Sequence, residues 1–197
     1  MADLLATPSD LASFLQQDVD TATATLLLEA ATGIVQTVTG QRIVQVVNDV
    51  AVLDVATLDC GLWLDLPQRP VTAVSAVLVG ALTVTDWTAQ LSRGRLWRAY
   101  GWRSAALPNY NMPSTVTVTY THGLPSGDQR LQAARQAALV LAAAGYSNPS
   151  GAVREQIDDY QVAYEAMSAR MEAAPALVAM LRRQYGRPAG SVRLVKA

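Results

Sequence analysis

The segment from Thr115 to Pro125 has the sequence TVTVTYTHGLP, in which apolar and polar side chains alternate strictly. Alternate residues of an extended chain point to opposite sides. One side would therefore carry Val116, Val118, Tyr120 and His122, and the other side would carry threonines. This period of two predicts a β-strand with one buried face that ends just before Gly123.

His122 is the one histidine of the chain, so its role bears on whether the protein is an enzyme. A catalytic histidine needs a nucleophile or a carboxylate beside it. The sequence has no GxSxG nucleophile motif, and Cys60 in TLDCGLW has no local motif around it. We therefore predict that His122 ends the strand and hydrogen-bonds a backbone group at the turn. We predict no catalytic residue and no enzyme.

The alternating pattern continues upstream of this strand, where the chain from Ile43 onwards is rich in Val, Thr, Trp and Tyr. Further short strands are expected within residues 42–55, 61–66, 71–79, 82–87 and 95–100. Tight turns are expected at Gly80–Ala81 and at Arg93–Gly94. Residues 104–114 are polar and contain proline, so they are predicted to form a loop.

A period of 3.6 residues flanks the alternating region on both sides. A short helix should begin after Thr7 and end near Asp18, and a second should run from Asp20 to Thr39 and stop at Gly40. Downstream helices are expected at 128–145 and 175–185. The second half of the 128–145 helix is apolar on all sides, which predicts burial all round. Residues 145–156 should form a loop, and those around Tyr160 should be extended.

The predicted fold class is therefore α+β. N-terminal helices pack with C-terminal helices in a small bundle, an antiparallel β-subdomain is inserted between them, and an extended C-terminal tail follows. The expected limits are 1–41 for the N-terminal helices, 42–123 for the β-subdomain, 124–186 for the C-terminal helices with a loop at 145–165, and 187–197 for a docking tail. A chain of 197 residues is long enough to bury a core of this kind without disulfides.

Composition argues against several classes of protein. Charged residues make up 16% of the chain, against about 25% in an average domain, which fits a surface in contact with other subunits. The net charge of −1 provides no general attraction to nucleic acid. One cysteine excludes an intrachain disulfide and a cysteine-based zinc site. The apolar run 137–146 is too short to span a bilayer, so we expect a soluble protein with no membrane partner.

Motifs for bound cofactors and metals are absent from the sequence. It has neither GxGxxG nor GxxxxGK[ST], so no cofactor is expected. Asp49, Asp54, Asp59 and Asp65 are scattered along the first strands without the glycine-containing loop of a calcium site. Asp158 and Asp159 are adjacent and so point apart in an extended chain, which argues against an acid–base pair.

Basic and aromatic residues alternate within DWTAQLSRGRLWRAYGWRS, residues 86–104. They are Arg93, Arg95, Arg98 and Arg103, with Trp87, Trp97, Tyr100 and Trp102. Three interpretations stay open. The tryptophans can face the core of a hairpin, they can form a protein–protein contact, or they can stack on single-stranded nucleic acid. For a protein contact, the candidate residues are Trp97, Arg98 and Trp102.

Several segments, in order and over nearly the whole chain, resemble the head–tail connector proteins of tailed bacteriophages, the head-to-tail adaptor family. PSDLASFLQQDVDTATATLLLEAATGIVQTVTGQRI is similar to that family's opening, through Leu11, Leu15, Leu27, Leu28, Ala31, Ile34, Thr39 and Gly40. LDLPQRPVTAVSAVLVGALTVTDW, residues 64–87, resembles a stretch of the family centred on "RPV". VTVTYTHGLP followed by an alanine-rich helix, QIDDYQVAYEA and LRRQYGRP resemble its later segments.

This resemblance implies a structural virion protein and not an enzyme. Members form a ring, usually of twelve copies, that lies beneath the portal protein, extends the DNA channel and attaches the stopper or tail. The implied partners are further copies of the chain, the portal protein, stopper or tail proteins, and genomic DNA that passes without sequence-specific binding. The implied location is the neck of the virion, after synthesis in the bacterial cytoplasm.

The resemblance also implies where partners bind, because the C-terminal segment of the family docks on the portal or a neighbouring subunit. The matching residues lie between 182 and 197, and the candidates are Arg182, Arg183, Tyr185, Arg187, Val192, Arg193, Leu194 and Val195. The 145–156 loop and Tyr160 would lie near the channel or the next ring. The large β-subdomain departs from the simplest members, which leaves open which surface faces the tail.

Three alternatives stay open at this point. The first is another neck or tail structural protein, either a stopper or a tail terminator. The second is a nucleic-acid-binding module that uses residues 87–103. The third is an enzyme whose site contains His122 and Asp65.

Overall fold

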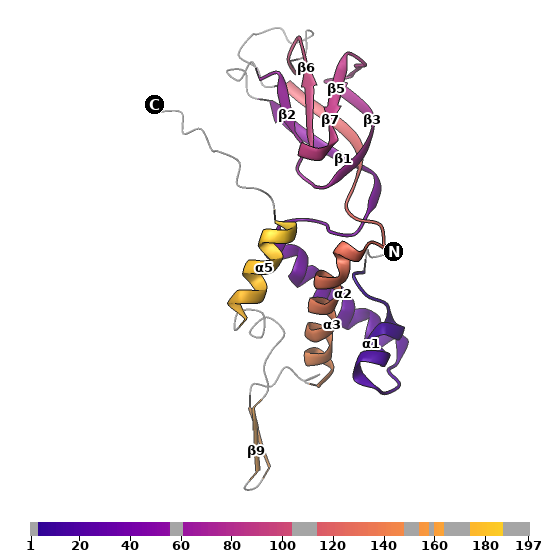
Figure 1. Cartoon of the computed structure of the whole chain (residues 1–197), viewed down its shortest axis with the longest axis vertical. Coiled ribbons are helices and arrows are strands. Elements are labelled where there is room, and N and C mark those ends of the chain that lie inside the picture. The colour runs from indigo at the N-terminus through magenta and orange to yellow at the C-terminus, as the bar shows by residue number, and fades with distance from the viewer. Residues whose placement is uncertain are drawn as a thin grey trace, which may run out of the picture. The chain divides into compact units, whose positions relative to one another are not determined.

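The computed structural model describes residues 4–55, 61–103, 114–147, 154–157, 160–163 and 174–186. The chain divides into two compact units. Met1–Val44 and Ser126–Ala197 form the first, which we call the helical unit, and Gln45–Pro125 form the second, which we call the β unit. Helices and antiparallel sheets occur together, so the predicted α+β class is confirmed (Figure 1).

The described helices of the helical unit are α1 (Pro8–Leu15), α2 (Thr21–Thr39), α3 (Gln132–Ser147) and α5 (Pro175–Tyr185). A 3-10 turn, η2 (Gln129–Leu131), leads into α3. Helix α2 contacts α1, α3 and α5, and α1 also contacts α3. Their shared core contains fully buried leucines from each helix, Leu11, Leu28, Leu141 and Leu181.

The helix ends follow from the capping residues that the sequence displays. The hydroxyl of Thr7 accepts a hydrogen bond from the Asp10 backbone N–H, and the Asp10 carboxylate accepts one from the Thr7 backbone N–H. Asp20 caps α2 by accepting from the Thr23 backbone N–H at 2.9 Å. Gly40 ends α2 with φ of 66°, a left-handed conformation that glycine adopts without strain. Helix α5 spans the predicted residues, 175–185.

Alanines let α3 lie close to its neighbours. Ala134, Ala138 and Ala142 are completely buried in the helical unit, and small side chains of this kind reduce the distance between packed helices. The prediction that the second half of α3 is buried all round is wrong, because Leu139, Val140 and Tyr146 are only partly buried. Helices α1 and α2 cover one side of α3, and the other side is partly exposed.

Two antiparallel sheets make up the β unit. The first has the strand order β1 (Val46–Val55), β7 (Ser114–His122), β3 (Val71–Val79) and β4 (Leu82–Thr83). The second has the order β2 (Trp63–Asp65), β6 (Arg95–Arg98) and β5 (Trp87–Gln90). A 3-10 turn, η1 (Leu91–Arg93), joins β5 to β6. Strand β7, which contains the alternating TVTVTYTH segment, pairs with both β1 and β3.

The two sheets share one hydrophobic core. Strands β7 and β3 of the first sheet contribute Val116, Val118, Val77 and Val79, and the second sheet contributes Leu64 and Leu96. Every second residue of β7 is buried, from Ser114 to His122, as the period of two predicts. The opposite side of each sheet therefore faces away from this core.

Several predicted boundaries differ from the structure. The segment 82–87, predicted as one strand, contributes to two strands in different sheets. Leu82 and Thr83 form β4, which pairs with β3 up to the bond from Val84 N–H to the Val77 carbonyl oxygen, and Trp87 then begins β5. The 95–100 strand ends at Arg98, where Gly101 turns the chain with φ of 68°.

The predicted loops also require revision. Residues 146–147 belong to α3, and residues 154–156 belong to β8 (Arg154–Ile157), which pairs with β9 (Tyr160–Ala163). The predicted loop 104–114 lies outside the described residues except for Ser114, which begins β7. The predicted tail, residues 187–197, lies outside them as well.

Candidate interaction surface

A bulge in β1 decides what lies beside His122. Val46 is opposite His122, whereas Asp49 is opposite Tyr120, so β1 contains one more residue than β7 over this stretch. Asn48 absorbs the extra residue with φ of 56°. The bulge brings Asp49 to the same face of the sheet as Tyr120 and His122. The alternation of β1 is also reset, so that Ala51 and Leu53 pack on the core.

The partner of His122 is consequently a carboxylate from another strand. The Nε2 atom of His122 lies 2.8 Å from Asp49 Oδ2, and Asp49 Oδ1 accepts from the Val50 backbone N–H at 3.0 Å. The prediction of a backbone partner at the turn is therefore corrected. A backbone bulge, which no sequence motif marked, placed a residue 73 positions away in contact.

Burial determines what this pair can do. His122 is completely buried, and its ring centroid lies 5.1 Å from that of Tyr120. No group of three or more potential metal ligands occurs in the described part of the chain. Asp65, the other residue of the enzyme alternative, has different partners, accepting from Arg95 Nε at 2.6 Å and Arg69 Nη2 at 3.1 Å. The imidazole is shielded from solvent, and its contact with Asp49 joins β7 to β1.

The tryptophans divide between the core and the surface. Trp102 is 2% exposed, and its Nε1 donates to the Leu62 carbonyl oxygen at 3.2 Å. Trp87 also packs against the core. Trp97 lies on the other side of the second sheet, directly opposite Trp63, which is 49% exposed. The structure therefore buries Trp102, a predicted contact residue, and leaves Trp97 at the surface.

Trp63 was not among the predicted contact residues. The alternation in GLWLDL is the signal that could have identified it. If Leu64 and Leu66 are buried, Trp63 must point to the opposite, outer face. The composition of this segment predicts a strand but does not determine which face is buried.

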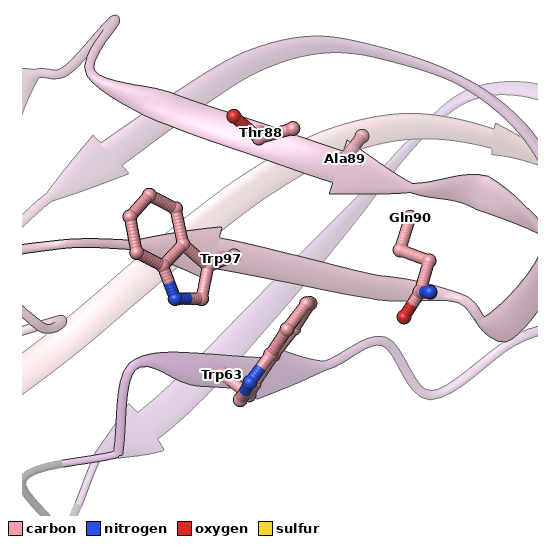
Figure 2. A pocket seen from close by; sticks show the side chains of 5 residues that line it. All are labelled: Trp63, Thr88, Ala89, Gln90 and Trp97. Atoms are coloured by element: carbon pink, nitrogen blue, oxygen red, sulfur yellow. The ribbon is translucent and has the colours of Figure 1, made fainter.

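An open pocket of about 360 Å³ lies beside these two tryptophans. Its lining is Trp63 from β2, Trp97 from β6, and Thr88, Ala89 and Gln90 from β5. Figure 2 shows the two indoles turned relative to one another, with Trp97 seen face-on and Trp63 edge-on. Concave sites with aromatic walls and a single amide accept an apolar group and orient it with few hydrogen bonds. Tryptophans that are accessible in this way, Trp63 exposed and Trp97 partly buried, are frequent at the centre of protein contacts.

Ion pairs engage most of the charge near the pocket. Arg98, a predicted contact residue, pairs through Nε with Asp86 at 2.9 Å and donates to the Gly101 carbonyl oxygen at 3.0 Å. Arg95 and Arg69 share Asp65. Guanidinium groups held by carboxylates are less available for phosphates, and the Arg69–Asp65–Arg95 group retains only one excess positive charge, so this geometry disfavours the nucleic-acid alternative.

Two of the predicted contact residues on α5 hold the helix within its own unit. Arg182 Nε donates to the Val38 carbonyl oxygen at 3.2 Å, at the end of α2. The Tyr185 hydroxyl donates to the Arg130 carbonyl oxygen, and burial raises the pKa of Tyr185 above its usual 10.0. Arg183, between them, is exposed.

The remaining predicted contact residues cannot be placed on a surface. Tyr160 begins β9 opposite Ile157. Arg187, Val192, Arg193, Leu194 and Val195 lie outside the described residues. In the part of the chain that the structure covers, no helix combines the length and the apolar character needed to cross a bilayer.

The helical unit contains an ion pair that should make its stability depend on pH. Asp10 of α1 accepts from Arg135 Nη2 of α3 at 2.5 Å. Burial acts to raise the pKa of Asp10, but hydrogen bonds from Arg135 and Thr7 lower it to about 2. A carboxylate whose pKa is lowered on folding adds stability above its unfolded pKa of 3.8, and this contribution is lost as the pH falls through about 2.

We expect Asp10→Asn to lower the free energy of unfolding of the helical unit by about 1–2 kcal/mol at pH 7, allowing for partial solvent screening. The difference from the unsubstituted protein should shrink between pH 4 and pH 2. Urea unfolding followed by circular dichroism at several pH values measures it. Glu29→Gln, on the exposed side of α2, is the matched control and should change little. An Asp10→Asn loss that stays constant down to pH 2 would contradict this account.

Comparison with known proteins adds information on the fold. No protein-family model matches the chain, and no curated protein matches its sequence. Solved structures do match. A chain described as the neck of an empty GTA particle computed with C6 symmetry is 17% identical, with a TM-score of 0.59 over 96% of this chain and 93% of that one. A chain from the neck of a native GTA particle computed with C12 symmetry has a TM-score of 0.53, with 17% identity over 95% of this chain and 96% of that one.

A third similar chain comes from the virion of a native gene transfer agent (GTA) particle, with a TM-score of 0.51, 18% identity, and coverage of 94% of this chain and 95% of that one. At these identities the likeness concerns the fold. It spans nearly the full length of each chain, so it includes both the helices and the inserted strands.

Proposed function

We propose that this chain is a structural protein of the neck of a tailed phage-like particle, and specifically a head-to-tail adaptor. The observation that carries the proposal is the likeness of fold over 96% of the chain to a chain in a neck, because both units and their order are included. The ordered sequence resemblance to head–tail connectors, from the PSDLASFL opening to LRRQYGRP, supports it independently.

In this role, copies of the chain form a ring under the portal, extend the DNA channel and attach the stopper or tail. The similar necks were computed with C6 and C12 symmetry, which supports a symmetric ring of identical subunits, with twelve as the proposed number. The buried His122, paired with Asp49, and the open tryptophan pocket fit a protein whose work is contact with other proteins. The net charge of −1 fits a channel wall that lets DNA pass without holding it.

A stopper is the second candidate, because a fold found in a neck is compatible with either position. The partner of the chain separates the two. An adaptor contacts the portal directly, whereas a stopper contacts an adaptor, so chemical crosslinking in intact particles should join this chain to the portal only if it is the adaptor.

The test places an amber codon in this gene within the genome that carries it. In a non-suppressing host we expect heads that are DNA-filled or leaking, alongside separate finished tails, in negative-stain electron microscopy. The same stock grown in a suppressing host is the matched control and should give joined, infectious particles. Complete infectious particles from the non-suppressing host would contradict the neck assignment.

A further inference from the structure

One side of the four-stranded sheet carries valines where a solvent-facing strand would carry polar residues. On β1, Val47, Val50 and Val52 are 65%, 55% and 64% exposed. The bulge at Asn48 sets this arrangement, since it keeps Ala51 and Leu53 on the core side and sends Val50 and Val52 outwards. We call Val47, Val50 and Val52 the valine face.

The neighbouring strands continue this surface without adding charge. Thr119 lies opposite Val50 and Thr117 opposite Val52, and on β3 the same rows continue to Ala76 and Leu78. Along a strand of an antiparallel sheet with one side in solvent, the residues on the exposed side are normally polar. Strand β1 is also at the edge of its sheet among the described strands. Exposed apolar side chains gathered on one face of a sheet are a typical site of protein association.

A second apolar surface lies on the other side of the β unit. The tryptophan pocket is on the outer face of the second sheet, since Trp63 and Trp97 alternate with Leu64 and Leu96, which are buried in the shared core. The valine face is on the outer face of the first sheet. Because one core lies between the two sheets, the two surfaces point in opposite directions.

Charges beside the two surfaces are complementary. Asp54 lies two residues beyond Val52, on the same side of β1, and is exposed. Next to Trp63 and Trp97, the adjacent row holds Asp65 and Arg95, and Arg69 shares Asp65 with Arg95. These three groups together carry a net positive charge. An acidic group beside one surface and a cationic cluster beside the other favour one orientation of contact.

We infer that the valine face of one copy of this chain packs against the tryptophan pocket of the next copy. Two different surfaces on opposite sides of a subunit make a head-to-tail contact, and such contacts form a ring when the rotation between successive copies closes. A two-fold contact would instead use the same surface twice. This inference rests on the proposed function, because it takes the occupant of the pocket to be a second copy in the ring.

Cysteine crosslinking inside assembled particles tests the inference. The parent variant is Cys60→Ser, to which Val52→Cys and Thr88→Cys are added singly and together. Thr88 lines the pocket and is exposed, so both substitutions lie at surface positions. Particles are treated with a short bis-maleimide, the products are separated on a denaturing gel, and linked peptides are identified by mass spectrometry.

We expect the double variant to give a ladder of covalent multimers with a linked peptide pair joining positions 52 and 88, and each single variant to give none. Val52→Cys combined with Ala30→Cys, at an exposed position on α2, is the matched control and should stay monomeric on the gel. A covalent dimer from Val52→Cys alone, joined through position 52 of both copies, would show a two-fold contact and overturn the inference.

The remaining outcomes separate the two proposals. If the chain is present in purified particles and the double variant gives no ladder, the contact is wrong while the neck assignment stands. If the unsubstituted chain is absent from purified particles, the neck assignment fails, and the ring contact falls with it.

Discussion

Trp102→Ala should lower the free energy of unfolding of the β unit by about 3–5 kcal/mol, the usual cost of replacing a buried tryptophan by alanine. Trp102 is 2% exposed and belongs to the cluster that both sheets share. Its replacement leaves a large cavity and deprives the Leu62 carbonyl oxygen of the indole N–H that lies 3.2 Å away. Urea unfolding followed by far-ultraviolet circular dichroism measures the loss.

Tyr100→Ala is the matched control, because Tyr100 is an aromatic residue two positions earlier that is 85% exposed. We expect it to change the free energy of unfolding by no more than about 0.5 kcal/mol. Equal losses for the two variants would contradict the division of this segment between core and surface. Since the protein has two units, the loss should appear in the transition of the β unit.

That division shows how far the sequence predicts the fold. The starts of α1 and α2 were predictable because they depend on residues a few positions apart, such as Thr7 with Asp10. The end of α1 was not, since the helix stops at Leu15 and not near Asp18. The buried face of β7 was predictable because nine residues give several full periods of alternation. Strand β6 has four residues and therefore too few alternations to decide which of its side chains are buried.

The composition of the tryptophan pocket could not be predicted for a related reason. Trp63 and Trp97 are 34 positions apart in the sequence, and only the register of β2 with β6 brings them together. Aromatic residues are also equally suited to a core and to a contact surface. The residue types therefore left three interpretations of the Trp/Arg segment open, and the structure buries Trp102 in the core and places Trp97 in the lining of the pocket.

The valine face could not be predicted from the sequence because of the bulge in β1. In the sequence RIVQVVNDVAVLDV, no regular alternation runs through the whole segment, because the phase changes at Asn48. Residues before and after the bulge then need separate assignment to the two faces. The same change of phase places Asp49 beside His122, so one backbone feature accounts for both the internal pair and the exposed valines.

His122→Ala should lower the free energy of unfolding of the β unit by about 2–4 kcal/mol, combining a cavity with a lost hydrogen bond. The imidazole is completely buried, contacts the Tyr120 ring and bonds to Asp49 across two strands. Thr115→Ala, on the exposed side of the same strand, is the matched control and should cost less than about 1 kcal/mol. Chemical denaturation of the three proteins provides the comparison.

The same variant distinguishes a structural histidine from a catalytic one. A structural residue affects function only through the amount of folded protein, so His122→Ala particles made at low temperature should be as infectious, per copy of the chain incorporated, as particles with the unsubstituted chain. A catalytic residue would show the reverse pattern, with normal stability and normal incorporation but no infectivity. The buried position of the imidazole, and its contacts with Asp49 and Tyr120 inside the fold, lead us to expect the first result.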